Sequence, residues 1–434
     1  MKRKIIFGIS LIVFLLPYFL SPPAGLTIQG FKALSVFAIS LFWWITNVVP
    51  LMITSLFAIV AFPLMGLASS KEVYSYFGNT AVFFLIGSFI LASAFKRSGL
   101  SKKIAFSMIK LSKSSKALVL FVQYTAMFLS FLMSGHAVVA ILIPIVLEVR
   151  SSEKLLKPLI FSVMWGAIIG SNATLLGGAR GPLAIALLQA WNGQSISFSK
   201  WSIASLPIVV TTSIASSILL FKITPYEKLE IHVEEISTTK RQIQVGMIMA
   251  ASIFFWFSYG EKFGIANISL AAVIILFMLK LIKWKEVEED VNWGIILMYG
   301  GAIVLGKMLQ QTGVASWFVE YIKNMPGGLF LVLLSISALV LTETMSNSAV
   351  VVMLMQIALP AATRMGIDPR LATLAVTIPA GFAFMLPMSS PSVAIALSTG
   401  RIDLRDTIKY GILLEVVAVV SIILFGTVVW KVII

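Results

Sequence analysis

A short polar segment inside a long apolar stretch carries side chains suited to binding an anion. Ser346, Asn347 and Ser348 supply two hydroxyl groups and one amide. These are the donors that a carboxylate or a sulfate needs when it loses its water. The alternative is a turn rich in serine and asparagine that holds no ligand. Because a polar turn in apolar surroundings is costly, we predict that these residues contact an anion.

Arg180 and His136 are two further polar residues within apolar runs. Arg180 lies in the segment 177–181, where glycines break an apolar helix. A guanidinium at membrane depth costs about 3 kcal/mol or more unless it is paired. Its partner is either Glu343 or a substrate carboxylate held bidentately; otherwise Arg180 makes only a structural pair or reaches toward the interface. His136 is a hydrogen-bond donor to substrate, a proton carrier or a simple structural histidine.

The composition of the chain places it in a lipid bilayer. Of its 434 residues, 59% are hydrophobic and 12% are charged, which excludes a soluble enzyme. The net charge of +15 comes from short basic clusters between apolar runs, so nucleic acid is not the expected partner. The chain has no cysteine and only two histidines, His136 and His232. This argues against metal and thiol chemistry and against an intramembrane enzyme.

Membrane helices must position these polar residues. Because about 20 apolar residues cross a bilayer, we predict ordinary spans at 5–20, 31–48, 51–66, 79–95, 202–222, 243–260, 265–282, 293–309 and 411–434. Segments 117–149 and 327–362 are too long for one crossing and too short for two, which predicts re-entrant hairpins. Segments 158–191 and 371–400 contain Gly, Pro and Ser and are predicted to be broken helices. Broken backbone at membrane depth indicates a site.

Lysine and arginine predict the orientation. If both hairpins return to the side they enter from, the inside loops hold basic clusters at 2–4, 96–116, 150–157, 222–241, 280–285 and 401–409. The outside loops keep Lys71, Lys200, Lys262, Lys323, Arg364, Arg370 and Lys431. This asymmetry predicts a plasma-membrane protein with its N-terminus in the cytoplasm and its C-terminus outside. Segment 101–116 is predicted to be an interfacial amphipathic helix.

The two halves of the chain share an internal repeat. Three segments recur in the same order at nearly constant spacing, namely 87–91 with 301–305, 133–139 with 345–351, and 183–187 with 393–397. Under the predicted topology the two copies have opposite orientations. Inverted repeats of transporters build midplane sites from discontinuous helices, whose N-termini attract anions and whose free carbonyls hold cations. The repeat therefore predicts transport by alternating access.

Two segments, 341–349 and 382–391, resemble the divalent-anion/sodium symporter family of dicarboxylate, citrate and sulfate carriers, and the likeness runs from about residue 31 to the end. In that family each hairpin tip carries Ser-Asn-Thr and each broken helix carries Thr-Pro. The second half keeps this pattern with serine for threonine, as Ser346-Asn347-Ser348 and Ser390-Pro391. The first half departs from it, with Ser134-Gly135-His136 at the tip and Arg180 at the break.

The resemblance implies substrate contacts at both tips and both breaks, by Ser134, Gly135, His136, Arg180, Ser346, Asn347, Ser348, Ser390 and Pro391. It also implies a sodium ion held mainly by carbonyls, together with Thr342, Asn347 and Ser389. A first-half sodium site would use Ser130 and Ser134, but Gly135 supplies no side-chain oxygen. We therefore expect a single sodium ion or none, with Arg180 partly replacing the missing ion.

The prediction is an all-α polytopic membrane protein with two inverted-topology repeats, about 11 transmembrane helices and two re-entrant hairpins. Its parts are an N-terminal span and turn, a first repeat, a cytoplasmic linker and a second repeat, at 1–30, 31–223, 224–242 and 243–434. The expected function is secondary active, cation-coupled transport of a divalent anion, foremost a di- or tricarboxylate, without an organic cofactor. A sodium-independent or proton-coupled anion exchanger is the alternative, and an anion channel is a more remote one. The resemblance adds a homodimer with a scaffold domain and a moving transport domain.

Overall fold

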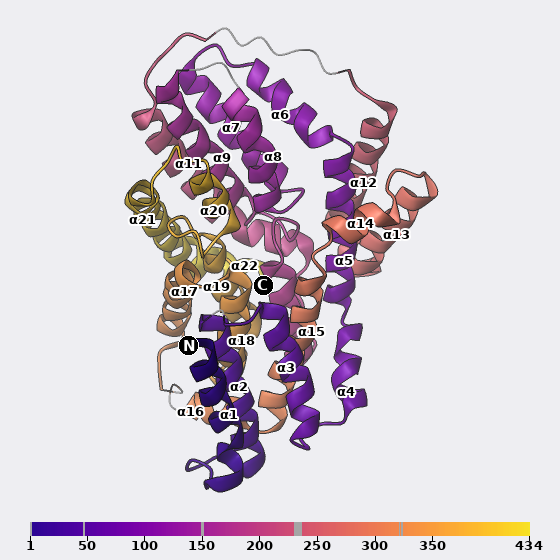
Figure 1. Ribbon diagram of the computed structural model, residues 1–434, viewed down its shortest axis with the longest axis vertical. Helices are drawn as coiled ribbons and strands as arrows, with labels where there is room; N and C mark the ends of the chain where they lie inside the picture. Colours follow the sequence, from indigo (N-terminus) through magenta and orange to yellow (C-terminus); the bar gives the residue numbers. More distant parts are fainter. Residues whose placement is uncertain (1, 47, 149–151, 230–236, 321, 323) are drawn as a thin grey trace.

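The computed structural model describes the chain except for residues 1, 47, 149–151, 230–236, 321 and 323. All regular elements of the described residues are helices (Figure 1). Seven helices are long and apolar enough to cross a membrane, and five shorter helices are also apolar. The predicted all-α polytopic class is confirmed, whereas about 11 crossings stays a prediction. His232 and the middle of the predicted linker 224–242 lie outside the described residues.

The helices of the first half are α1 (Lys2–Phe19), α2 (Ile28–Thr46), α3 (Leu51–Leu64), α4 (Ser70–Ser75), η1 (Tyr76–Gly78), α5 (Thr80–Arg97), α6 (Leu100–Lys110), α7 (Ser115–Ser130), α8 (Gly135–Glu148), α9 (Glu153–Gly170), α10 (Arg180–Asn192) and α11 (Phe198–Ile223). Local signals set several ends. Gly99, with φ +78°, precedes α6, and the Ser114 hydroxyl caps α7. The predicted interfacial helix 101–116 therefore ends sooner, at Lys110.

The helices of the second half are α12 (Lys240–Phe263), α13 (Ile265–Met278), α14 (Trp284–Asp290), α15 (Trp293–Gln311), α16 (Val314–Glu320), α17 (Gly327–Thr344), α18 (Asn347–Arg364), α19 (Pro369–Thr377), η2 (Pro379–Gly381), α20 (Pro391–Ser398), α21 (Leu404–Ser421), η3 (Ile422–Gly426) and α22 (Thr427–Ile433). A capping box between Thr239 and Gln242 begins α12. The last predicted span, 411–434, begins earlier than expected, at Leu404.

The two predicted hairpins are pairs of helices joined by short turns. In the first, α7 ends at Ser130 and α8 begins at Gly135. In the second, α17 ends at Thr344 and α18 begins at Asn347. Figure 1 shows the first hairpin in the upper part of the molecule and the second in the lower part. Whether each hairpin enters and leaves a membrane on one side stays a prediction.

The two predicted broken helices are interrupted where glycine and proline gather. The first break separates α9 from α10 and contains Gly177 and Gly178. The second break separates α19 from α20 and contains Pro379, Pro387 and the short helix η2. Proline has no N–H and cannot continue a helical hydrogen-bond ladder. Backbone groups in both breaks are therefore free to bind side chains or ligands.

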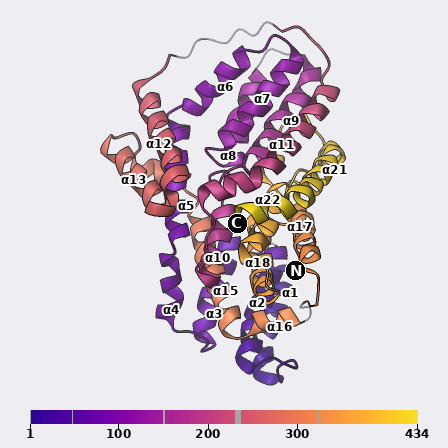
Figure 2. The same ribbon diagram turned by 180° about the vertical axis from the view of Figure 1, so that it is seen from behind.

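The repeated elements run in opposite directions. In Figure 1, α5 runs upward from α4 to α6, whereas its counterpart α15 runs downward from α14 to α16. Each α-helix that follows a break packs on the hairpin of the other half, because α10 contacts α18 and α20 contacts α8. Figure 2 shows α10, α15 and α18 close together from behind. This exchange brings both hairpin tips and both breaks to the middle of the molecule.

Candidate functional site

The second hairpin tip gathers three oxygen atoms. The Thr342 hydroxyl oxygen lies 2.8 Å from Asn347 Oδ1 and 2.9 Å from the carbonyl oxygen of Ala380, in the second break. A hydroxyl has one hydrogen to donate, so one of these two acceptors receives none from it. A group of oxygens with too few hydrogens, largely shielded from solvent, suits a small hard cation. The residues predicted for the second sodium site therefore fit that ion at Thr342 and Asn347.

Ser346 and Ser348 flank Asn347, and both are half-buried. Ser346 Oγ accepts a hydrogen bond of 3.3 Å from the Ala349 N–H and so caps α18. This bond uses an acceptor site of the hydroxyl and leaves its hydrogen available. Ser346 can therefore begin the helix and still donate to an anion.

The second break ends in Ser389, Ser390 and Pro391. Ser389 Oγ donates to the Leu386 carbonyl at 2.5 Å, and Ser390 Oγ accepts from the Ser392 N–H at 3.3 Å. Pro391 occupies the first turn of α20, where a missing N–H costs no helical hydrogen bond. Among the described residues no hydrogen bond joins Ser389 to the Thr342–Asn347 pair, so its place around sodium stays a prediction.

Glu343 binds the backbone of the second break. One oxygen of its carboxylate accepts from the N–H groups of Phe384 and Met385 at 2.9 and 3.2 Å, and the other accepts from Leu386 at 2.8 Å. Glu415, on α21, also accepts from Phe384, at 3.4 Å. Both glutamates are buried. Glu343 thus holds the break to the hairpin and is not the partner of Arg180.

The first hairpin tip is held differently. The Gly135 N–H donates to the Gly177 carbonyl of the first break at 3.3 Å. A Cβ atom at Gly135 would lie only 2.9 Å from the Ala167 carbonyl oxygen, so a side chain there requires α9 to shift. Ser134 Oγ lies 3.2 Å from His136 Nε2. Close packing on α9 therefore explains why this tip has glycine where the second tip has asparagine.

Ser130 is the first-half counterpart of Thr342. It is fully buried, and its hydroxyl oxygen has no hydrogen-bond partner within the described part of the chain. Because Gly135 adds no side-chain oxygen, a cation here meets fewer ligands than at the second tip. The donor set of the first half fits a sodium ion less well.

Arg180 lies between the two breaks. Its Nη2 donates to the Ser171 carbonyl at 3.1 Å and to Asn172 Oδ1 at 2.7 Å, and the guanidinium packs against Gly381 of the second break. Asn172 Nδ2 in turn donates to the Gly381 carbonyl at 3.0 Å. Arg180 is 6% exposed, and its Nε is buried without a hydrogen-bond partner. Among the described residues no carboxylate lies within ion-pair distance of it.

A cavity of about 290 Å³ reaches the first tip. It is lined by residues of α5, by Ser134 and His136 at the tip, by Ala179 next to Arg180, and by Asp290. His136 is exposed to this space. The cavity is large enough for a small organic anion, and its wall includes two of the predicted substrate residues.

The structure thus joins the predicted site residues into three groups. Gly135, next to the Ser134–His136 pair, bonds the first break; Thr342, which bonds Asn347, also bonds the second; and Arg180 links the breaks. Sequence reasoning missed Asn172, which holds the guanidinium, and Glu415, which shares the Phe384 N–H with Glu343. A lone acid in an apolar span signals function or pairing, so the signal for Glu415 was present in the sequence; Asn172 carried no comparable signal.

The whole chain, residues 1–434, matches the family described as the sodium:sulfate symporter transmembrane region. The chain therefore belongs to this family, which consists of membrane transporters and not enzymes. Among curated proteins it is similar to the sodium-dependent dicarboxylate transporter SdcS of Staphylococcus saprophyticus, with 26% identity over 95% of this chain and 88% of that protein. SdcS of Staphylococcus aureus strain NCTC 8325 is 28% identical over the same shares.

Among solved structures the chain resembles the YdaH transporter of Alcanivorax borkumensis. The TM-score is 0.60 at 12% identity, and the match covers 98% of each chain. This likeness concerns the fold. Together with the family match it confirms the predicted class, a polytopic secondary transporter.

Proposed function

We propose that this protein is a sodium-coupled carrier of a divalent organic anion of the dicarboxylate class, working by alternating access. One observation carries the proposal. The buried Arg180 guanidinium has only neutral oxygen partners among the described residues. A desolvated charge is stable only with a counter-charge, and a carboxylate matches the planar guanidinium in geometry. A dicarboxylate would bind one end here and meet the serine donors of the hairpin tips with the other.

We propose that a single sodium ion accompanies the substrate, at Thr342 and Asn347. The oxygen cluster of the second tip supports this assignment, and the names of the SdcS relatives agree with sodium as the coupling ion. Arg180 takes the place of a second ion in the first half. Its charge lies beside Ser171, whose Cβ is in turn 3.3 Å from the position of a Cβ at Gly135.

We propose a plasma-membrane homodimer with its N-terminus in the cytoplasm and its C-terminus outside. The family resemblance supports the dimer, and the unequal distribution of lysine and arginine supports the orientation. Light scattering of the purified protein and cysteine labelling at positions 152 and 366 test these two points, because a cytoplasmic 366 or an external 152 would contradict the orientation.

Uptake into proteoliposomes tests the function. Labelled succinate is offered with an inward sodium gradient, with an equal potassium gradient, and with no gradient, while malate, citrate, 2-oxoglutarate, sulfate and phosphate compete. We expect accumulation only with sodium and strongest competition by C4-dicarboxylates. No uptake of any of these anions in any gradient would overturn the proposal.

A second candidate is sodium-independent exchange or proton coupling. Gly135 and His136 favour it, because the first tip lacks the oxygen ligand of the second tip and has an imidazole, a group that can carry a proton. Exchange would appear in the same experiment as uptake that requires internal anion and ignores sodium. Proton coupling would appear as uptake driven by an inward proton gradient alone.

A further inference from the structure

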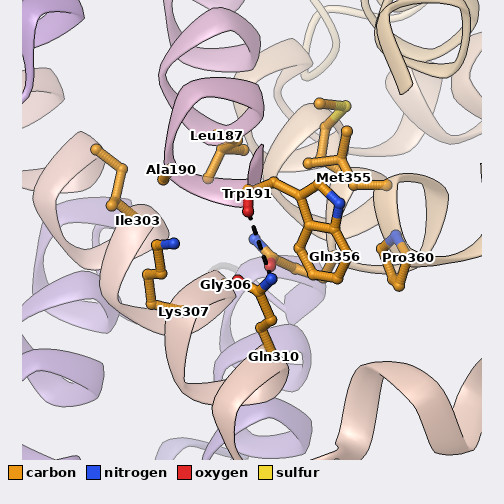
Figure 3. Close-up of a pocket in the computed structure, with 11 residues that line it drawn as sticks. Leu187, Ala190, Trp191, Ile303, Gly306, Lys307, Gln310, Met355, Gln356 and Pro360 are labelled. Carbon is orange, nitrogen blue, oxygen red and sulfur yellow. Dashed lines mark hydrogen bonds between the residues drawn. The ribbon is translucent and has the colours of Figure 1, made fainter. Parts of the chain in front are cut away.

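A second, much smaller cavity lies between α10, α15 and α18 (Figure 3). Its volume is about 10 Å³, which is roughly the space of one water molecule. Trp191 from α10, Lys307 and Gln310 from α15, and Gln356 from α18 are among the residues that line it. In Figure 3 these side chains converge from the three helices on one space.

This cavity is the repeat counterpart of the large one. The spacing that relates Gly87 to Gly301 also relates Ser93 to Lys307 and Lys96 to Gln310. Ser93 and Lys96 line the cavity of about 290 Å³, and Lys307 and Gln310 line the closed one. The inverted repeat therefore places equivalent faces of α5 and α15 on two vestibules, of which one is open and the other is shut.

The closed vestibule is rich in donors that lack acceptors. Gln356 is 6% exposed, and its Nε2 is buried without a hydrogen-bond partner. Lys307 is half-buried, and no carboxylate of the described residues lies within ion-pair distance of it. Gln310 Nε2 donates to the Trp191 carbonyl at 3.4 Å. A buried amide donor beside an unpaired ammonium group is the chemistry that an anion requires.

The open vestibule is different in charge. There Lys96 Nζ lies 3.2 Å from Asp290 Oδ1, and Arg97 Nε lies 2.5 Å from Asp290 Oδ2. Asp290 thus neutralises cations at that end, and it has no equivalent beside Lys307 among the described residues. The cations at the open vestibule are therefore paired with a carboxylate, whereas Lys307 at the closed vestibule is not, within the described part of the chain.

We propose that Lys307 and Gln356 form an entry station for a carboxylate or an inorganic oxyanion at the closed vestibule, occupied when that vestibule opens; this inference rests on the proposed transport function. An uncompensated charge in a narrow vestibule raises the local anion concentration and speeds association. Loss of the Lys307 charge therefore weakens substrate entry from this face and leaves entry from the other face unchanged.

The absence of cysteine from the chain allows a sharp test. Lys307→Cys introduces the only thiol, and proteoliposomes of defined orientation report the KM for succinate from each face. We expect about a tenfold rise in KM from the closed-vestibule face only. Aminoethyl methanethiosulfonate, which restores an ammonium group, is expected to return KM to within about twofold of wild type. The anionic sulfonatoethyl reagent is expected to leave it raised.

Two further variants complete the test. Gln356→Met removes the buried amide donor at similar volume and is expected to raise the same KM about threefold. Lys71→Gln, on α4, removes an exposed charge that does not line the vestibule and serves as the matched control. A wild-type KM in Lys307→Cys, an equal rise from both faces, or equal effects of the two reagents would overturn the inference.

The proposed function and this inference fail in distinguishable ways. If the wild type transports normally and Lys307→Cys keeps the wild-type KM, the proposed function is supported and the entry station is refuted. If the wild type transports none of the tested anions, the proposed function fails. The entry station is then tested by the rate at which the thiol of the Lys307→Cys variant is modified. Slower modification in sulfate than in chloride of equal ionic strength supports an anion site there, and equal rates refute it.

Discussion

The two hairpin tips occupy equivalent positions in the two repeats but carry different polar residues. At the second tip, Thr342 and Asn347 place side-chain oxygens against the Ala380 carbonyl. At the first tip, Gly135 packs on α9 with no room for a side chain, and the Arg180 guanidinium supplies a buried charge at the neighbouring break. The two halves share helix order and packing because these depend on apolar faces. In the proposed mechanism, a few polar positions then decide whether a half binds a mobile cation or carries a fixed one.

The largest expected effect concerns the fixed cation. Arg180→Ala removes a charge-assisted partner from a desolvated anion, which typically costs about 2 to 5 kcal/mol. We therefore expect the Kd for dicarboxylate to rise roughly thirty-fold to several thousand-fold. Titration calorimetry on purified, folded protein measures this. Wild-type affinity in the variant would remove Arg180 from the site.

Arg180→Lys is the matched control for geometry. It keeps the charge but loses the planar fork of donors, so little affinity for a planar carboxylate should return. Full recovery of affinity in Arg180→Lys would contradict bidentate binding of the carboxylate.

The next effect concerns the mobile cation at the second tip. Asn347→Ala removes one of three clustered oxygens and is expected to abolish sodium stimulation of uptake. Ser130→Ala, at the position that matches Thr342, is expected to change the sodium dependence less than about twofold, because we propose that the first half holds no ion. Initial rates against sodium concentration decide this, and a wild-type Hill coefficient clearly above two would contradict a single ion.

A smaller effect concerns the second break, which Glu343 holds through three N–H groups. Glu343→Gln loses charge-assisted bonds and should lower the free energy of unfolding by about 1.5 to 3 kcal/mol. Thermal melting in detergent reports the loss. Glu415→Gln removes one of two adjacent buried carboxyl groups and keeps an oxygen for Phe384, so a much smaller change is expected. Equal losses in both variants would refute the special role of Glu343.

The smallest effect concerns Asp290 at the open vestibule. Burial alone would raise its pKa, but hydrogen bonds from Arg97, Ser93 and Lys96 outweigh burial and lower the pKa to about 2. A lowered pKa stabilises the fold above the unfolded value of 3.8, and this contribution disappears as pH falls through about 2. We expect this contribution to the free energy of unfolding to be about 1 kcal/mol, because solvent around the exposed Lys96 weakens its interaction with Asp290. The melting temperature should therefore depend less on pH in this range for Asp290→Asn than for the wild type. An identical pH dependence in the two proteins would contradict the assignment.

The sequence alone determined the class, the helical hairpins, the positions of both breaks and the family. Each of these depends on local properties. Apolar length decides which segments can be membrane helices, and glycine and proline decide where 171–179 and 382–390 leave the helix. The internal repeat was visible from a comparison of one half of the sequence with the other.

Only the tertiary structure decided the partners of the buried charges. Glu343 was a candidate for Arg180, but the packing of α17 on the second break turns it to the Phe384–Leu386 backbone. The exchange of α10 and α20 between halves brings Arg180 to Gly381, far away in the sequence. It also leaves one vestibule open and the Lys307 vestibule shut. Such contacts depend on how whole helices pack, which residue types and spacing along one chain do not specify.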